Sequence, residues 1–169
     1  MCGIGGYYQT GNTNNTPKWV KPALRKMWDN LQSRGSDASG IAYESPTGIR
    51  HYKTDKPAFE LSGLSMSLAF GMNRTPRWVM FHTRASTHGR PEENRNNHPL
   101  MGSRIALCHN GVVYNKDNVL RKYNTTAKRG VDTEAILVAL KNGGIDAVAK
   151  HVEGSMSISW AKGKTMYLW

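Results

Sequence analysis

The segment RWVMFHTRASTHG at residues 77–89 joins an apolar run to a polar loop. Residues 77–83 are apolar and bulky enough to predict a buried strand. The loop at 84–99 that follows contains Gly89, Pro91 and three asparagines. Because a loop of this length with little secondary structure of its own is usually functional, the sequence predicts a functional loop directly after a buried strand.

Outward from this segment, strands and helices are predicted in mixed order. Strands are predicted at 3–8, 41–44, 49–53, 104–109, 156–160 and 165–169, helices at 59–70, 116–122, 132–140 and 144–152, and a loop at 11–16. The strand at 104–109 is expected to break at Asn110-Gly111, a strong turn dipeptide. Several strands are expected to form hairpins instead of alternating strictly with helices, and this order favours an α+β sandwich with antiparallel sheets.

One more helix is predicted between Pro17 and Gly35. Proline is tolerated in the first turn of a helix, and glycine is an expected stop signal at the other end. Four apolar residues recur between them at helical spacing, at Val20, Leu24, Met27 and Leu31. These four are therefore expected to face the core.

The length and composition bound the class of protein. The 169 residues are typical of one domain, which is expected to span residues 1–169 with no fused synthase domain. The 38% hydrophobic and 21% charged content is typical of a soluble globular chain. No apolar run approaches the roughly 20 residues of a membrane span, and the N-terminus lacks the basic region of a secretory signal. A cytoplasmic location without membrane contact is expected.

The charge balance is strongly basic, with 23 Lys and Arg against 12 Asp and Glu and a formal net charge of +11. A positive field favours encounter with anionic partners. The basic residues are spread along the chain without a block of five or six together, which favours a solvated surface. Proximity to a nucleotide or nucleic acid stays open as an alternative.

The two cysteines are interpreted differently. Cys108 lies inside an apolar run and is expected to be a buried structural residue. Cys2 follows Met1, which an aminopeptidase removes readily when the second residue is small. Cys2 would then carry both a thiol and a free α-amine with a pKa of about 8. Such an amine can accept the thiol proton and activate the nucleophile without a separate histidine.

Cys2 belongs to the first of six short sequence motifs that occur in a fixed order along the chain. They are MCGIGG at 1–6, RGSDASG at 34–40, HTRASTHG at 82–89, NHP at 97–99, HNG at 109–111 and DTE at 132–134. In this order they resemble the class II glutamine amidotransferase domains of glucosamine-phosphate synthase and amidophosphoribosyltransferase, which are N-terminal-nucleophile hydrolases. The resemblance implies a four-layered αββα sandwich with two mainly antiparallel sheets. It also implies hydrolysis of L-glutamine to glutamate and ammonia.

The resemblance implies three catalytic residues. Cys2 would attack the side-chain amide of glutamine and form a γ-glutamyl thioester. The Asn110 side chain and the Gly111 backbone N–H would form the oxyanion hole. Two such donors, aimed at the developing charge, are each worth roughly 2.7–4 kcal/mol of barrier.

The resemblance also implies how the substrate is held. Arg84 and Thr87 would bind the α-carboxylate, since a guanidinium fork fits a carboxylate bidentately. Asp132 would hold the α-ammonium, and it is also an ordinary helix N-cap. Four further residues are expected to support the site: Arg34, Gly35, Asp37 and His98.

No metal or other cofactor is expected. The histidines are dense in this region, at positions 82, 88, 98 and 109. They lack the cysteine or histidine pairing and the acidic surroundings of a zinc site, and each belongs to a block of the resemblance. They are expected to order the loop around the pocket.

Three interpretations of the function follow. In the first, a glutaminase subunit supplies ammonia to a separate synthase or acceptor subunit. In the second, the same fold acts on another amide or a γ-glutamyl compound, which loss of Arg84 or Asp132 would have favoured. In the third, the chain is a non-catalytic binding or regulatory module, which retention of Met1 would favour because it blocks the amine.

Overall fold

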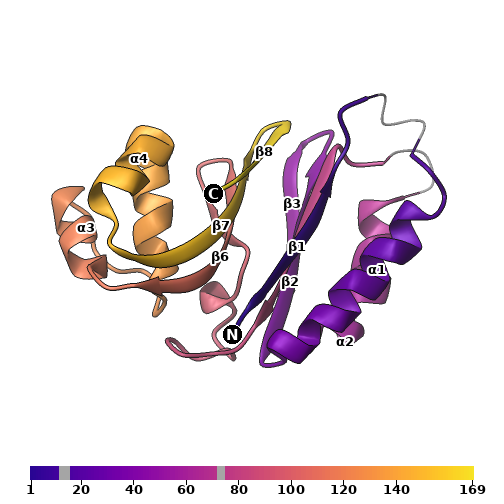
Figure 1. Cartoon of the computed structure of the whole chain (residues 1–169), viewed down its shortest axis with the longest axis horizontal. Helices are drawn as coiled ribbons and strands as arrows, with labels where there is room; N and C mark the ends of the chain where they lie inside the picture. Colours follow the sequence, from indigo (N-terminus) through magenta and orange to yellow (C-terminus); the bar gives the residue numbers. More distant parts are fainter. Residues whose placement is uncertain (12–15, 72–74) are drawn as a thin grey trace.

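The structure, a computed structural model, describes residues 1–11, 16–71 and 75–169. Two four-stranded antiparallel sheets are stacked face to face between two layers of helices (Figure 1). The first sheet has the strand order β1-β4-β2-β3, and the second has the order β5-β6-β7-β8. The predicted α+β sandwich of antiparallel sheets is confirmed. The predicted loop at 11–16 lies largely outside the described residues, because 12–15 are not among them.

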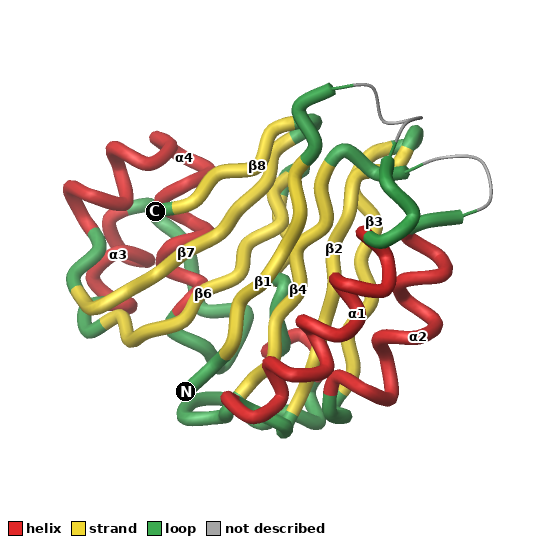
Figure 2. The backbone as a smooth tube through the Cα atoms, turned by 45° about the vertical axis from the view of Figure 1, so that its right-hand side comes forward, coloured by secondary structure: helices red, strands yellow, loops and turns green. Residues whose placement is uncertain are grey.

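The first sheet and its two helices form one half of the molecule. Its elements are β1 (Gly3–Tyr8), α1 (Val20–Leu31), the short 3-10 helix η2 (Gln32–Arg34), β2 (Ala38–Ser45), β3 (Gly48–Thr54), α2 (Ala58–Ala69) and β4 (Trp78–Arg84). Helices α1 and α2 cover the outer face of this sheet, as Figure 2 shows. The prediction that 77–83 form a buried strand is confirmed, since every residue of β4 is buried.

The buried face of α1 differs from the prediction at one position. Met27 was expected in the core, but it is 37% exposed and Trp28 is fully buried instead. Val20, Leu24 and Trp28 are spaced by four, so their side chains form one stripe along the helix. The indole of Trp28 packs against Phe81 of β4, with ring centroids 5.4 Å apart.

The second half contains the other sheet. Its elements are the 3-10 helix η3 (Asn94–Asn96), β5 (Leu100–Gly102), β6 (Ile105–Val113), α3 (Lys116–Lys122), α4 (Thr133–His151), β7 (Gly154–Lys162) and β8 (Thr165–Leu168). Strand β5 was not predicted, because three residues carry too little periodicity. Gly143 and Gly144 have non-helical backbone angles, so α4 is kinked into two helical parts. These two parts correspond to the separate helices predicted at 132–140 and 144–152.

The predicted turn at Asn110-Gly111 is wrong. Strand β6 continues through both residues, with Asn110 paired to Ser157 and Gly111 to Met156 of β7. Gly111 has φ +147, and a Cβ built on it would lie 1.9 Å from the Ser155 carbonyl oxygen. Position 111 therefore requires glycine because the Ser155 backbone of the neighbouring strand lies very close to it, and not because the chain turns there.

Small and apolar residues fill the space between the two sheets, including Ala42, Trp78, Ala106, Cys108 and Ala161. Cys108 is fully buried, and burial raises the pKa of its thiol. The prediction that Cys108 is a buried residue is confirmed. Among the described residues, no helix combines the length and apolar character needed to cross a bilayer.

Candidate active site

The candidate residues of the first sheet meet at one end of its strands. Gly3 of β1 pairs with Thr83 of β4, which places Cys2 beside the end of β4 where Arg84 lies. Ala38, the first residue of β2, pairs with Arg84 from the other side. The N-terminus accordingly lies at the lower edge of the sandwich in Figure 1.

Cys2 is half-buried at this end. Its Sγ lies 3.6 Å from the Ala85 carbonyl oxygen, and its own carbonyl oxygen accepts a hydrogen bond of 3.1 Å from Arg34 Nε. Met1 is 83% exposed, so the bond between Met1 and Cys2 is open to solvent on the methionine side. Arg34 thus fixes the backbone next to the thiol.

Gly35 and Asp37 support the loop that follows β4. A Cβ on Gly35 would lie 2.3 Å from the Arg84 carbonyl carbon, so only glycine allows this approach. The Asp37 N–H donates to the Arg84 carbonyl oxygen at 3.0 Å. The Asp37 carboxylate in turn accepts a hydrogen bond of 2.7 Å from the Ser86 N–H. The segment after α1 therefore sets the position of the backbone from Arg84 to Ser86.

Arg84 is buried and organises its own loop. Its guanidinium donates to Asn97 Oδ1 at 2.6 Å, to the Gly89 carbonyl oxygen at 2.8 Å and to the His88 carbonyl oxygen. Burial lowers the pKa of Arg84, while nearby Cys2 and then Asp37 and Asp132 act to raise it. These bonds use three of the five N–H groups of a guanidinium.

Asn97 and Lys53 were not predicted as parts of the site. Asn97 is fully buried, and its Nδ2 donates to the Pro91 carbonyl oxygen at 2.7 Å. Its backbone carbonyl accepts a hydrogen bond of 2.8 Å from Lys53 Nζ. Burial lowers the pKa of Lys53 to about 8. The block Asn97-His98-Pro99 could have drawn attention to Asn97, whereas a lysine on a strand is usually solvated and gave no signal.

Asp132 lies directly before α4. Its Oδ1 accepts a hydrogen bond of 2.9 Å from the Thr133 N–H, and its Oδ2 accepts one of 2.7 Å from the Val113 N–H. The predicted N-cap is therefore confirmed. Asp132 is only partly buried, and it lines an open pocket together with His88, Val113, Gly130 and other residues.

Asn110 and Gly111 lie on β6 of the second sheet. Asn110 is partly buried and Gly111 is exposed. One hydrogen bond joins this part of β6 to the first sheet, from His82 Nε2 of β4 to the His109 carbonyl oxygen at 3.1 Å. His82 precedes Arg84 by two residues and His109 precedes Asn110 by one, so this bond connects the two halves of the candidate site.

Thr87 is exposed on the loop. Its Oγ1 lies 3.2 Å from Nδ1 of His88, which is also exposed. The structure therefore places Thr87 outside the buried group around Arg84, unlike the other predicted site residues of this loop.

Three histidines form a buried polar layer under the site. The rings of His82 and His98 stack with centroids 4.3 Å apart, and His98 and His109 both contact Thr133. Burial lowers the pKa of His82 to about 3 and that of His98 well below its usual value. Burial also lowers the pKa of His109, which Asp132 and the Ser155 backbone act to raise. Among the described residues, no three His, Cys, Asp or Glu side chains are grouped to hold a metal ion.

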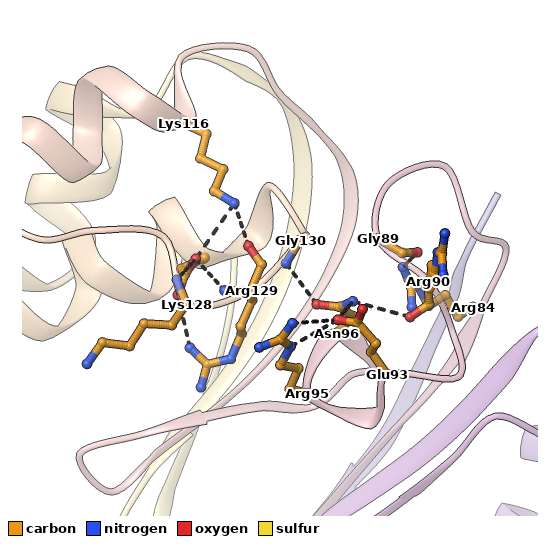
Figure 3. A network of polar contacts seen from close by, with 11 residues as sticks. Arg84, Gly89, Arg90, Glu93, Arg95, Asn96, Lys116, Lys128, Arg129 and Gly130 are labelled. Atoms are coloured by element: carbon orange, nitrogen blue, oxygen red, sulfur yellow. Dashed lines mark hydrogen bonds and ion pairs between the residues drawn. The ribbon is translucent and has the colours of Figure 1, made fainter.

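A second network holds the 84–99 loop against the segment before α4. The buried Glu134 carboxylate accepts hydrogen bonds from the Lys128 and Arg129 N–H groups, each at 3.1 Å. The next residue, Gly130, donates through its N–H to Asn96 Oδ1 at 2.8 Å. Figure 3 shows this link between Gly130 and Asn96, with Arg129 on one side and Arg84 on the other. The loop carrying Arg84 and the segment leading to Asp132 are therefore tied together.

Residues 82–169, just over half of the chain, match the family of glutamine amidotransferase domains. The chain is 32% identical over 152 residues to glutamine–fructose-6-phosphate aminotransferase (isomerizing) of Bacillus licheniformis, covering 86% of this chain and 23% of that protein. It is 30% identical over 176 residues to the protein of the same name from Geobacillus kaustophilus, covering 99% of this chain and 25% of that one. The chain thus spans about a quarter of the length of these relatives.

Two solved structures share the arrangement of the chain. One is glutamine phosphoribosylpyrophosphate amidotransferase from B. subtilis complexed with ADP and GMP, with a TM-score of 0.69 and 17% identity over 99% of this chain and 36% of that one. The other is the allosteric regulatory enzyme of purine biosynthesis, with a TM-score of 0.68 and 18% identity over 95% of this chain and 35% of that one. At these identities the likeness shows the fold alone, and it confirms the predicted αββα sandwich.

Proposed function

The chain belongs to the family of glutamine amidotransferase domains, and from this premise we propose that it is a glutaminase in which Cys2 cleaves the side-chain amide of L-glutamine. The observation that carries the proposal is the position of Cys2. Its carbonyl oxygen accepts a hydrogen bond from Arg34, and it lies beside the end of β4, where Arg84 is buried. A nucleophile beside a buried cation is suited to a substrate that carries a carboxylate.

The nucleophile requires a base, and the α-amine of Cys2 supplies it once Met1 is removed. The exposure of Met1 is compatible with access by an aminopeptidase. The amine takes the thiol proton as sulfur attacks the amide carbon, and the resulting ammonium returns a proton to the departing ammonia. Water then hydrolyses the γ-glutamyl thioester, which regenerates the thiol and releases glutamate.

The developing oxyanion is stabilised by the Asn110 side-chain amide and the Gly111 backbone N–H. The strand conformation of Gly111 supports this role, because a side chain at that position would collide with the Ser155 backbone. An unhindered N–H on an exposed glycine can approach a substrate oxygen closely. Donors of this kind act without reorganisation when the negative charge forms.

The charged end of glutamine is held by residues of both halves of the site. The two guanidinium N–H groups of Arg84 that are not used by its loop bind the α-carboxylate, with Thr87 as a second donor. Asp132 binds the α-ammonium. Its carboxylate accepts two backbone N–H groups, and a carboxylate has about four acceptor sites, so capacity remains for the ammonium.

The released ammonia serves an acceptor site. The names of the relatives describe transfer of glutamine nitrogen to a second substrate, which supports this part of the proposal. That the acceptor lies on a separate subunit stays a prediction, which copurification of the chain with an ammonia-consuming enzyme would test. A nucleotide-containing acceptor, suggested by the charge of +11, also stays a prediction.

The proposal is tested by glutamate formation from L-glutamine. The wild-type chain, Cys2→Ala and Cys108→Ala are compared after mass spectrometry has established whether Met1 is absent. We expect activity in the wild type and in folded Cys108→Ala, and none in Cys2→Ala. Substantial turnover by Cys2→Ala would overturn the mechanism, and turnover of another amide in preference to glutamine would overturn the substrate.

A further inference from the structure

Thr133 places one hydroxyl group between two buried imidazole rings. Its Oγ1 lies 3.0 Å from Nε2 of His98 and 2.9 Å from Nδ1 of His109. All three side chains are buried, Thr133 with 1% of its surface exposed. Thr133 is the first residue of α4, whereas His98 belongs to the loop after β4 and His109 to β6. One hydroxyl therefore joins three segments that are distant in sequence.

Each of these segments carries a residue of the proposed site next to the contact. Asp132, proposed to bind the ammonium, precedes Thr133. Asn110, proposed to stabilise the oxyanion, follows His109. Asn97 precedes His98 and accepts a hydrogen bond from Arg84, proposed to bind the carboxylate. The three residues joined by this hydroxyl are therefore direct sequence neighbours of Asp132, Asn110 and Asn97, respectively.

Thr133 is the hydrogen-bond partner that the two rings share. Nδ1 of His98 has no hydrogen-bond partner among the described residues, whereas the ring of His109 also lies beside the Ser155 backbone, which acts to raise its pKa. Among the described residues, the ring of His98 also stacks on His82, with centroids 4.3 Å apart. Thr133 therefore contributes to the orientation of both rings, since a buried polar atom that loses its partner is costly.

The single proton of the Thr133 hydroxyl restricts which ring nitrogens can carry a hydrogen. His82 must carry its proton on Nε2, because that atom faces the carbonyl oxygen of His109. A threonine hydroxyl has one proton, so it donates to one ring nitrogen and accepts from the other. His98 and His109 must consequently present one N–H and one bare nitrogen to Thr133. An apolar replacement would leave both nitrogens without a partner.

We infer that the Thr133 hydroxyl is a positioning group that fixes the spacing between the oxyanion hole and the two substrate-binding residues, Arg84 and Asp132. This inference rests on the proposed function. Thr133 does not touch the reacting atoms; it acts through His98 and His109. Its loss lets Asn110 and the Arg84 loop move relative to Asp132, which weakens glutamine binding and slows the chemical step together.

The test compares Thr133→Val, which keeps the branched shape without the hydroxyl, with Thr133→Ser, which keeps the hydroxyl. We expect Thr133→Val to lower kcat and raise KM for glutamine, with a combined loss in kcat/KM of about tenfold to a hundredfold, as misplacement of reacting groups produces. Thr133→Ser restores most of kcat/KM. The matched control is Ser62→Ala, which removes a buried hydroxyl bonded to Asp29 between α1 and α2 and changes the melting temperature without changing kcat/KM.

The outcomes separate this inference from the proposed function. A wild-type chain without glutaminase activity overturns the proposed function, and the inference falls with it. An active wild type together with a folded Thr133→Val of unchanged kcat and KM overturns the inference alone. If Thr133→Val does not fold, Thr133→Ala replaces it. If neither folds while Thr133→Ser does, the hydroxyl is required for folding and the positioning role is overturned.

Discussion

The Nε of Arg34 donates a hydrogen bond of 3.1 Å to the Cys2 carbonyl oxygen, so the 3-10 turn that follows α1 fixes the backbone that carries the thiol. The position of the nucleophile is therefore expected to depend on Arg34, although the side chain is exposed and contributes little to stability.

Replacing Arg34 by Met should lower glutaminase kcat by about tenfold, because a displaced nucleophile loses its attack geometry. The free energy of unfolding should change by about 0.5 kcal/mol or less, as is typical of exposed positions. Steady-state kinetics and urea unfolding measure the two effects. Arg25→Met, an exposed arginine of α1, is the matched control, and an unchanged kcat in Arg34→Met would remove Arg34 from the support of the nucleophile.

Replacing Asp132 by Asn should raise the KM for glutamine by about tenfold to a hundredfold, because a hydrogen bond to a charged group is worth about 1.5–3 kcal/mol. Stability should change much less, since asparagine also caps a helix N-terminus. The measurement is KM beside the melting temperature. Asp117→Asn, an exposed carboxylate in the first turn of α3, is the control. A KM equal to that of the wild type would show that Asp132 does not bind the ammonium.

Acid should destabilise the fold through the buried histidines. Burial lowers the pKa of His82 to about 3 from 6.5, and it lowers those of His98 and His109 as well. Above pH 6.5, the pKa of histidine in the unfolded chain, these histidines are neutral in both states and the folded state keeps its full stability. As the pH falls from 6.5 towards 3, the unfolded chain binds more protons than the folded chain, so the free energy of unfolding decreases. Each such histidine changes the free energy of unfolding by about 1.4 kcal/mol per pH unit within its window.

Urea unfolding at several pH values between 7 and 4 measures this dependence. The exposed His88 provides the control, and His88→Gln should keep the wild-type slope. His82→Asn should reduce the slope by about one proton even if it lowers the stability at pH 7. An equal slope in His82→Asn and the wild type would show that His82 is not held neutral in the folded state.

Replacing Glu134 by Gln should lower the free energy of unfolding by about 3–5 kcal/mol, because it leaves part of a buried ionic network unpaired. The carboxylate is 2% exposed and lies 3.3 Å from Arg129 Nη1 and 3.6 Å from Lys116 Nζ. Glu153→Gln, an exposed carboxylate that lines the open pocket together with Asp132, is the control. A loss below about 1 kcal/mol would show that the network does not hold the segment before α4.

The sequence predicted best the helices and strands whose first and last residues are marked by local sequence features. Strand β1 and helix α3 have the predicted boundaries, at Gly3–Tyr8 and Lys116–Lys122. The buried strand after Pro76 was visible because four consecutive apolar residues, at 78–81, lie shortly before the polar loop. At Asn110-Gly111, by contrast, the turn signal misled, because glycine freedom serves a close approach to Ser155 inside β6.

The contacts inside the candidate site could not be predicted from the sequence. Arg84 was assigned a substrate carboxylate, and nothing in its block indicated that three of its N–H groups hold the loop. Thr133 lies in the block DTE at 132–134, but nothing in that block indicated its contacts with His98 and His109. The contacts of Arg84 lie within its own loop, and those of Thr133 join that loop to β6 and α4. They follow from the folded arrangement of these segments and not from any local sequence pattern.

The central claim, that Cys2 is an active nucleophile for glutamine, is tested most directly by intact-mass spectrometry of the purified chain with and without the glutamine analogue 6-diazo-5-oxo-norleucine. The account predicts loss of Met1 and one adduct on Cys2, prevented by glutamine, with Cys108 unmodified. A chain that lacks Met1 and forms no adduct, or forms it on Cys108, would contradict the account. A retained Met1 without an adduct would contradict it equally, because the amine that serves as the base would be blocked.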